Sequence, residues 1–209
     1  MIVKYTEIRE ELVRLAASLF ERGFSVGSAG NISVKVEGGY LMTPTNASLG
    51  RLDPQRLSLL DDQFNHIDGD RPSKEVVMHQ AMYRARPQTG AIVHLHSTFA
   101  TAVSCLAPAG ESTIVPHTPY LVMRMGSHIP LVPYYKPGDP RMEQDIVEAS
   151  EKAPALLLAN HGSLVAGATL VQAVDSAEEL EVSAQLELLL HGRETRPLTE
   201  GEIQALLTR

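Results

Sequence analysis

The hydrophobic pattern of the chain mixes helical and extended periods. Apolar side chains that recur every three to four residues predict helices over residues 6–22, 72–86, 139–150 and 169–190, with shorter helices at 98–106 and from residue 199. Short apolar stretches, alternating or continuous, predict strands over residues 32–36, 40–43, 57–60, 91–97, 129–132, 155–159 and 163–166. Gly38 and Gly39 predict a hairpin between the first two strands, and the polar segment 61–71 has room for another.

Proline interrupts regular structure between residues 107 and 140, which contain seven of the 13 prolines. We expect this segment to be irregular apart from the strand at 129–132. Cys105, the one cysteine of the chain, lies just before it among small apolar residues and is expected to be buried. A single cysteine excludes disulfides within the chain and fits a reducing cytoplasm.

The composition is that of an ordinary globular protein. The 209 residues are 44% hydrophobic and 21% charged, with a formal net charge of −7, and this length predicts one domain over residues 1–209. The acidic balance argues against nucleic acid as the main partner, because that binding needs a basic surface, whereas a small anion needs only a few donors. The sequence has no signal-peptide pattern and no apolar run of the roughly 20 residues that cross a bilayer, so we expect a cytoplasmic protein without membrane contact.

Two histidines, His94 and His96, interrupt an apolar strand. Successive side chains of a strand point to opposite faces, so both imidazoles point to the same side, while Ile92, Val93 and Leu95 are expected in the core. A single histidine in a strand is more often a packed residue than a ligand. A pair on one face, however, is a poor apolar surface and a good start on a tetrahedral zinc site. The pattern therefore predicts a metal site that needs a further ligand.

His161 is the predicted third ligand. It follows an apolar strand and lies between Asn160 and Gly162, so its side chain projects from a tight turn at a sheet edge, where α/β sheets commonly place ligand sites. Three neutral imidazoles with an open position are typical of catalytic zinc, whereas structural zinc is usually enclosed by cysteines. For the remaining histidines we predict no ligand role: a structural or supporting position for His79, a surface position for His66 and His191, and no assignment for His117 and His128.

Glu75 opens the helix at 72–86. A carboxylate in the first turn often only offsets the helix dipole, but beside a metal it is able to fill the fourth position and to act as a proton-transfer base once substrate displaces it. Three polar pairs combine amide or hydroxyl donors with freely turning backbone and together predict a phosphate-binding cradle, although each alone is more often a turn or a cap. These pairs are Gly30-Asn31, Thr45-Asn46 and Ser73-Lys74.

Five motifs, in order, make the chain resemble the class II aldolase and adducin head family over nearly its whole length. The motifs are Ser28-Ala29-Gly30-Asn31-Ile32-Ser33, Thr43-Pro44-Thr45, Ser73-Lys74-Glu75, His94-Leu95-His96 and Asn160-His161-Gly162. The resemblance implies an α/β fold of three layers, α/β/α, around a largely antiparallel sheet, and a homotetramer with active sites between subunits. It implies zinc on the three histidines and Glu75 as resting ligand and acid/base. Phosphate binding is implied for Asn31, Thr45 and Ser73.

Departures from the family's aldolases indicate a particular branch. Those aldolases usually read Ser-Ser-Glu and Thr-Pro-Thr-Gly, where this chain has Ser73-Lys74-Glu75 and Thr43-Pro44-Thr45-Asn46. Together with segments 46–51, 116–120 and 135–139, this is similar to the 3-oxo-tetronate 4-phosphate decarboxylases. Lys74 then adds a cation for a doubly anionic substrate. The family's aldolases also use a tyrosine from a neighbouring subunit near the position of Tyr120.

The resemblance thus implies a zinc-dependent lyase acting on a small phosphorylated sugar acid. C1 would leave as carbon dioxide, and the electrons of the C1–C2 bond would form a C2–C3 enediolate, whose negative charge zinc would stabilise. A proton returned by Glu75 or an acid near it would give dihydroxyacetone phosphate. The nearest alternative is a sugar-phosphate aldolase of the fuculose or ribulose phosphate type, or an epimerase, on the same scaffold. A second alternative is a non-catalytic module like the adducin head, which need not keep all four predicted ligands.

Overall fold

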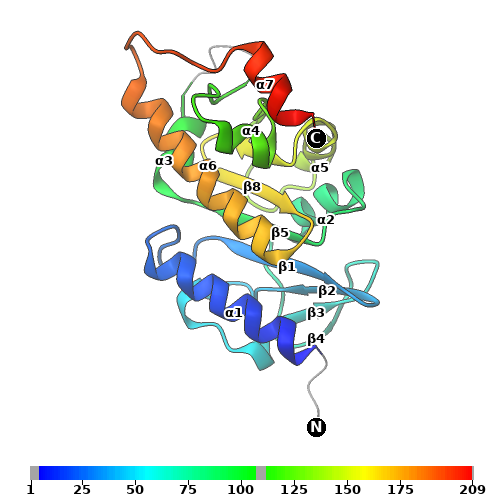
Figure 1. Ribbon diagram of the computed structural model, residues 1–209. Coiled ribbons are helices and arrows are strands. Elements are labelled where there is room, and N and C mark those ends of the chain that lie inside the picture. The colour runs from blue at the N-terminus through cyan, green and yellow to red at the C-terminus, as the bar shows by residue number, and fades with distance from the viewer. Residues whose placement is uncertain (1–4, 107–111, 209) are drawn as a thin grey trace.

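A single eight-stranded sheet forms the centre of the computed structural model, which describes residues 5–106 and 112–208 (Figure 1). The strands are β1 (Asn31–Val36), β2 (Gly39–Met42), β3 (Ser58–Leu60), β4 (His66–Asp68), β5 (Ala91–Leu95), β6 (Leu131–Val132), β7 (Ala155–Leu158) and β8 (Gly162–Gly167). Their order across the sheet is β4-β3-β2-β1-β5-β8-β7-β6. Neighbouring strands are antiparallel except for the parallel pair β6 and β7. The predicted largely antiparallel sheet is therefore confirmed.

Helices cover both faces of this sheet, which confirms the predicted three layers. The helices are α1 (Thr6–Glu21), α2 (Val76–Ala85), α3 (Thr98–Ser104), α4 (Pro119–Met125), α5 (Met142–Lys152), α6 (Leu170–Leu190) and α7 (Glu200–Leu207), with short 3-10 turns at Leu49–Arg51 and Pro54–Arg56. One buried cluster joins α1, α3, α4 and α6 to one face of the sheet, and a second joins α2 and α5 to the other. In Figure 1, α1 and α6 lie across the near face.

Alternation along β5 decides which layer the predicted metal site faces. Val93 and Leu95 belong to the cluster with α6, whereas Ile92 belongs to the cluster with α2 and α5, and all three are fully buried. His94 lies two residues after Ile92 and therefore points to the α2 side. The strand ends at Leu95, so His96 lies just beyond it.

The proline-rich segment was not as irregular as the sequence predicted. Helix α4 (Pro119–Met125) lies within it, and the predicted strand at 129–132 is reduced to Leu131 and Val132. Residues 107–111 of this prediction lie outside the described residues. The expectation that Cys105 is buried was wrong, because its position after the last turn of α3 leaves it exposed.

In the part of the chain that the structure describes, no helix combines the length and the apolar character needed to cross a bilayer.

Candidate metal centre

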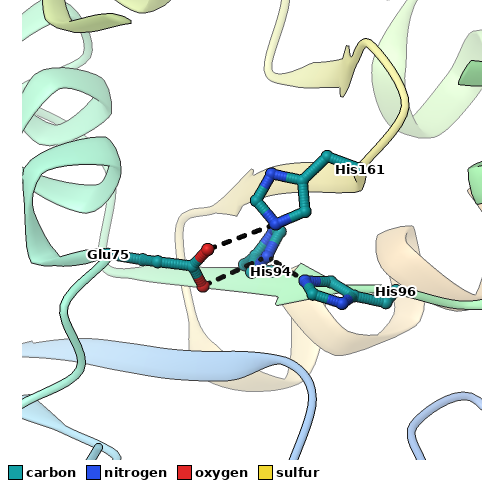
Figure 2. Close-up of side chains that lie close together, drawn as sticks. All are labelled: Glu75, His94, His96 and His161. Carbon is teal, nitrogen blue, oxygen red and sulfur yellow. Dashed lines mark hydrogen bonds and ion pairs between the residues drawn. The ribbon is translucent and has the colours of Figure 1, made fainter. Parts of the chain in front are cut away.

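Three histidines converge where β5 ends and the turn between β7 and β8 approaches it (Figure 2). The Nε2 atoms of His94 and His96 lie 2.9 Å apart, and the ring centroids of the three imidazoles are separated by 4.6 to 4.9 Å. His161 is brought there by a tight turn in which Asn160 has φ 56°. At Gly162 a Cβ atom would lie 2.2 Å from the Leu95 carbonyl oxygen, so only glycine permits this close approach. The predicted convergence of the three imidazoles is present.

Glu75 reaches the same point from the residue before the first turn of α2. Its Oε1 lies 3.2 Å from His161 Nε2 and its Oε2 lies 3.4 Å from His94 Nε2. Figure 2 shows the carboxylate facing the imidazoles from the opposite side. The Asn31 amide, at the start of β1, donates a hydrogen bond of 2.7 Å to Oε2.

The donor set fits a divalent metal. One potential ligand atom from each of Glu75, His94, His96 and His161 lies within 4.8 Å of all the others. His94 Nδ1 donates to the Ser163 carbonyl at 2.7 Å, which leaves Nε2 unprotonated and free to coordinate. His161 Nε2 is buried and, apart from the facing Glu75 carboxylate at 3.2 Å, has no hydrogen-bond partner among the described residues, the condition expected of a nitrogen that coordinates a metal. Three imidazole nitrogens and a carboxylate match the chemistry of zinc sites.

Burial keeps the imidazoles of His94 and His96 neutral, because it lowers the pKa of each ring. Desolvation lowers the pKa of His94 to about 3, although the Glu75 carboxylate opposes the shift. The pKa of His96 is lowered for the same reason, with a contribution from His161. Burial raises the pKa of Glu75, but the facing His161 and His94 and the Asn31 amide outweigh it, so this pKa lies below its ordinary value. The cluster therefore holds an anionic carboxylate at Glu75 and neutral rings at His94 and His96, the forms that bind a metal.

The loops predicted to bind phosphate lie beside this cluster. The backbones at Pro44 and Pro72 form a bridge, which brings the loop of Thr45 next to the loop that precedes Glu75. In that second loop, the Ser73 hydroxyl accepts a 3.2 Å hydrogen bond from the Glu75 backbone N–H.

Two of the predicted phosphate-binding residues, Thr45 and Asn46, line a cavity of about 300 Å³ that also contacts Arg51. Asn46 is exposed and adopts φ 57°, and Lys74 is exposed as well. Asn31, by contrast, is almost fully buried and contacts Glu75 directly, a role that its motif did not predict.

Tyr120 does not join the cluster within its own chain. It lies in α4, is 62% exposed, and lines a cavity of about 680 Å³ together with Gly167, at the end of β8 opposite to Gly162. A role for this tyrosine in the site of a neighbouring subunit stays a prediction.

Two further residues support the site: the sequence predicted a structural or supporting position for His79, but no supporting role for Glu181. His79 is fully buried, and its Nε2 lies 2.6 Å from Asn31 Oδ1. Glu181 is one of five acidic residues in the helix predicted at 169–190, and the sequence alone favours a solvated or partner-facing side for them. For Glu181 this expectation was wrong, because it is 8% exposed and accepts hydrogen bonds from the Ser97 hydroxyl and from the backbone N–H groups of Phe99 and Ala100. It thus caps α3 directly after His96. The helical period was a usable signal, because position 181 falls on the same face as the buried residues at 177 and 184.

Comparison with known proteins identifies relatives over most of the chain. Residues 10–188 match the family model described as Class II Aldolase and Adducin N-terminal domain. A 3-oxo-tetronate 4-phosphate decarboxylase of Escherichia coli is 51% identical over 201 residues, which cover 95% of this chain and 94% of the relative. A decarboxylase of the same name from Haemophilus influenzae is 47% identical and covers 96% of each chain.

Solved structures with a similar fold were also found. The crystal structure of YgbL from Escherichia coli superposes with a TM-score of 0.92 at 49% identity, covering 96% of this chain and 98% of that one. An L-fuculose 1-phosphate aldolase superposes with a TM-score of 0.87 at 27% identity, covering 98% and 96%. The aldolase is thus similar in fold but more distant in sequence.

Proposed function

The chain belongs to the class II aldolase and adducin family, and from this membership we propose that it is a zinc-dependent decarboxylase that converts a 3-oxo-tetronate 4-phosphate into dihydroxyacetone phosphate and carbon dioxide. The observation that carries the proposal is the intact cluster of Glu75 and three histidines. Four relatives named 3-oxo-tetronate 4-phosphate decarboxylase are 47 to 51% identical to the chain over nearly its whole length. A non-catalytic module, as in the adducin alternative, would not need these four metal ligands.

The reaction needs an electron sink next to the bond that breaks. The C1–C2 bond of the substrate breaks, C1 leaves as carbon dioxide, and the electron pair moves toward the C3 ketone, giving an enediolate across C2 and C3. A proton added at C2 then completes the triose phosphate. When bound by His94, His96 and His161, zinc supplies a Lewis acid that stabilises negative charge on the substrate oxygens.

Glu75 is the proposed proton carrier. Its carboxylate faces the imidazoles, is largely buried, and has a lowered pKa, so it is present as the anion when substrate arrives. It is then positioned to accept a proton from a substrate hydroxyl and to return one to C2. His94 remains an oriented ligand because the Ser163 carbonyl holds its Nδ1–H.

The polar loops beside the cluster are proposed to hold the substrate phosphate. Backbone and side-chain donors there suit a dianion, and Lys74, which is exposed and directly precedes Glu75, adds a positive charge. The residues proposed for this task are Asn31, Thr45, Asn46, Ser73 and Lys74. We further propose a homotetramer in which Tyr120 enters the site of a neighbouring subunit, which its exposure on α4 permits.

A substrate comparison tests the proposal. Zinc-loaded protein incubated with the phosphorylated keto acid is expected to release carbon dioxide and dihydroxyacetone phosphate in equal amounts. The same preparation is expected to leave L-fuculose 1-phosphate and ribulose 1-phosphate uncleaved. The reverse result, with cleavage of either sugar phosphate and no carbon dioxide from the keto acid, would assign the chain to the aldolase alternative that the 27% identical structure represents.

A further inference from the structure

A chain of buried hydrogen bonds runs from Glu75 into the protein on the side away from the histidine cluster. Asn31 Nδ2 donates to Glu75 Oε2 at 2.7 Å, and Asn31 Oδ1 lies 2.6 Å from His79 Nε2. His79 Nδ1 lies 2.7 Å from the Ser33 hydroxyl, which in turn lies 3.1 Å from the Tyr83 hydroxyl. Each of the four residues behind Glu75 is at most 5% exposed. The proposed function gives no task to His79, Ser33 or Tyr83 in this series of hydrogen bonds.

The chemistry of the groups fixes the direction of every bond. A carboxylate only accepts hydrogen bonds, so the Asn31 side chain must turn its NH2 group toward Glu75 and its carbonyl oxygen toward His79. His79 must then carry its proton on Nε2, which leaves Nδ1 as an acceptor for the Ser33 hydroxyl. The Ser33 oxygen accepts from the Tyr83 hydroxyl. Burial lowers the pKa of His79 to about 4, which agrees with a neutral ring.

We propose that His79 is a positioning residue for the active site: its Nε2–H holds the Asn31 amide in the one orientation that presents N–H groups to the Glu75 carboxylate. The proposal rests on the proposed function, because it assigns a purpose to Glu75. Two hydrogen bonds, to Glu75 and to His79, hold the Asn31 side chain within the described residues. Without His79, the amide would be free to turn by 180° and to place a carbonyl oxygen against the carboxylate, where the two oxygens repel each other.

The consequence is a pair of buried histidines with opposite proton positions. His94 carries its proton on Nδ1, where the Ser163 carbonyl accepts it, and leaves Nε2 for a metal. His79 carries its proton on Nε2 and leaves Nδ1 for Ser33. Supporting groups that orient the primary ligands in this way typically contribute about 10- to 100-fold in metal affinity or activity.

The proton positions are measurable without any variant and without metal. Nitrogen-15 chemical shifts of histidine-labelled, metal-free protein report which ring nitrogen is protonated. We expect His79 in the Nε2–H form and His94 in the Nδ1–H form at neutral pH. A His79 ring protonated on Nδ1, or on both nitrogens, would overturn the proposal.

Two substitutions separate positioning from packing. His79→Leu removes the donor but retains apolar volume, and we expect kcat to fall about 10- to 100-fold and zinc to bind about 10-fold more weakly. His79→Gln keeps an N–H donor near the Nε2 position, and we expect both quantities to recover to within about threefold of wild type. Tyr83→Phe is the control, because it removes an equally buried hydroxyl without changing the direction of the bond to Asn31, and it is expected to keep kcat within about twofold.

The outcomes separate this proposal from the proposed function. Wild-type zinc affinity and kcat in His79→Leu, or equal losses in His79→Leu, His79→Gln and Tyr83→Phe, would contradict a positioning role. If the wild-type protein fails to decarboxylate the keto acid, the proposed function falls, while the ring tautomers and the zinc affinities still decide whether His79 orients the site.

Discussion

At the scale of single residues, Glu75 is proposed both as a resting metal ligand and as the proton carrier, and a substitution tests the second role. Its carboxylate faces His94 and His161 and accepts the Asn31 amide. Glu75→Gln keeps the size and a carbonyl acceptor for Asn31 but removes the negative charge and the ability to accept and return a proton. We expect kcat to fall at least about 100-fold, the lower end for a general acid or base, with the thermal midpoint little changed. Full activity in this variant would exclude Glu75 as the proton carrier.

His96 offers the sharpest test of the metal centre, because it lies just after the end of β5 and is not packed in the core. His96→Ala removes one of three imidazole ligands, so we expect both bound zinc and activity to be lost while circular dichroism stays native. His66→Ala is the matched control, since this exposed histidine of β4 lies outside the cluster. Retention of a full equivalent of zinc by His96→Ala, measured by elemental analysis, would contradict the ligand assignment.

The ligands were predictable from sequence, and so was a supporting position for His79, whereas the contacts that join these residues were not. His94 and His96 share a face because strand side chains alternate, and His161 ends an apolar strand at a turn; both are local patterns. The link from Glu75 through Asn31 to His79 joins residues 44 and 48 positions apart. Such a contact depends on the order of strands in the sheet, which no local periodicity contains.

At the scale of elements, the junction between β5 and α3 depends on a buried acidic residue of α6. The Glu181 carboxylate accepts from Ser97, Phe99 and Ala100. Glu181→Ala leaves these donors unsatisfied, and we expect the free energy of unfolding to fall by about 2 to 3 kcal/mol, by analogy with lost helix caps and buried hydrogen bonds. We also expect weaker zinc binding, because the cap directly follows His96.

Glu178→Ala provides the control on the same helix. Glu178 pairs with Arg22 at the surface, and such pairs contribute at most about 1 kcal/mol. Urea unfolding at constant m-value measures both variants. An equal loss of stability in the two would mean that Glu181 acts as a surface charge rather than as a cap.

Helix α4 illustrates which elements a local pattern fails to predict. Its seven residues lie between prolines, and the density of proline favoured an irregular segment. Pro119, however, occupies the first turn, where its fixed φ and missing N–H are tolerated. The helix then packs against the core through three buried side chains, those of Leu121, Val122 and Met125. The start signal was present in the sequence, but tertiary packing decided that the helix forms.

At the scale of the whole molecule, the site depends on strand order. Strand β5 lies between β1 and β8, so the segment that carries His94 has Asn31 on one side and the turn of His161 on the other. Periodicity predicted most of these strands but not their neighbours. The three layers and the antiparallel sheet came from the resemblance carried by five ordered motifs, and the structure confirms them.

The buried histidines also determine how the stability of the fold depends on pH. The pKa of His79 is about 4 in the folded chain, below the value near 6.5 of an unfolded histidine. The unfolded chain therefore binds more protons between these values, and stability falls as the pH drops from about 6.5 to about 4. Between pH 7 and pH 5, His79 alone is expected to cost about 2 kcal/mol. Glu75 adds nothing in this interval, because its lowered pKa removes stability only below about pH 4.5.

His79→Gln isolates this contribution, because glutamine does not titrate. Urea unfolding of metal-free protein, at pH 7 and pH 5 and one protein concentration, should show a loss of stability smaller in the variant by about 2 kcal/mol. Other groups, including His94 with a folded pKa of about 3, give both proteins the same remaining loss. Equal losses in the two proteins would mean that His79 binds a proton in the folded chain as readily as in the unfolded one, which its complete burial argues against.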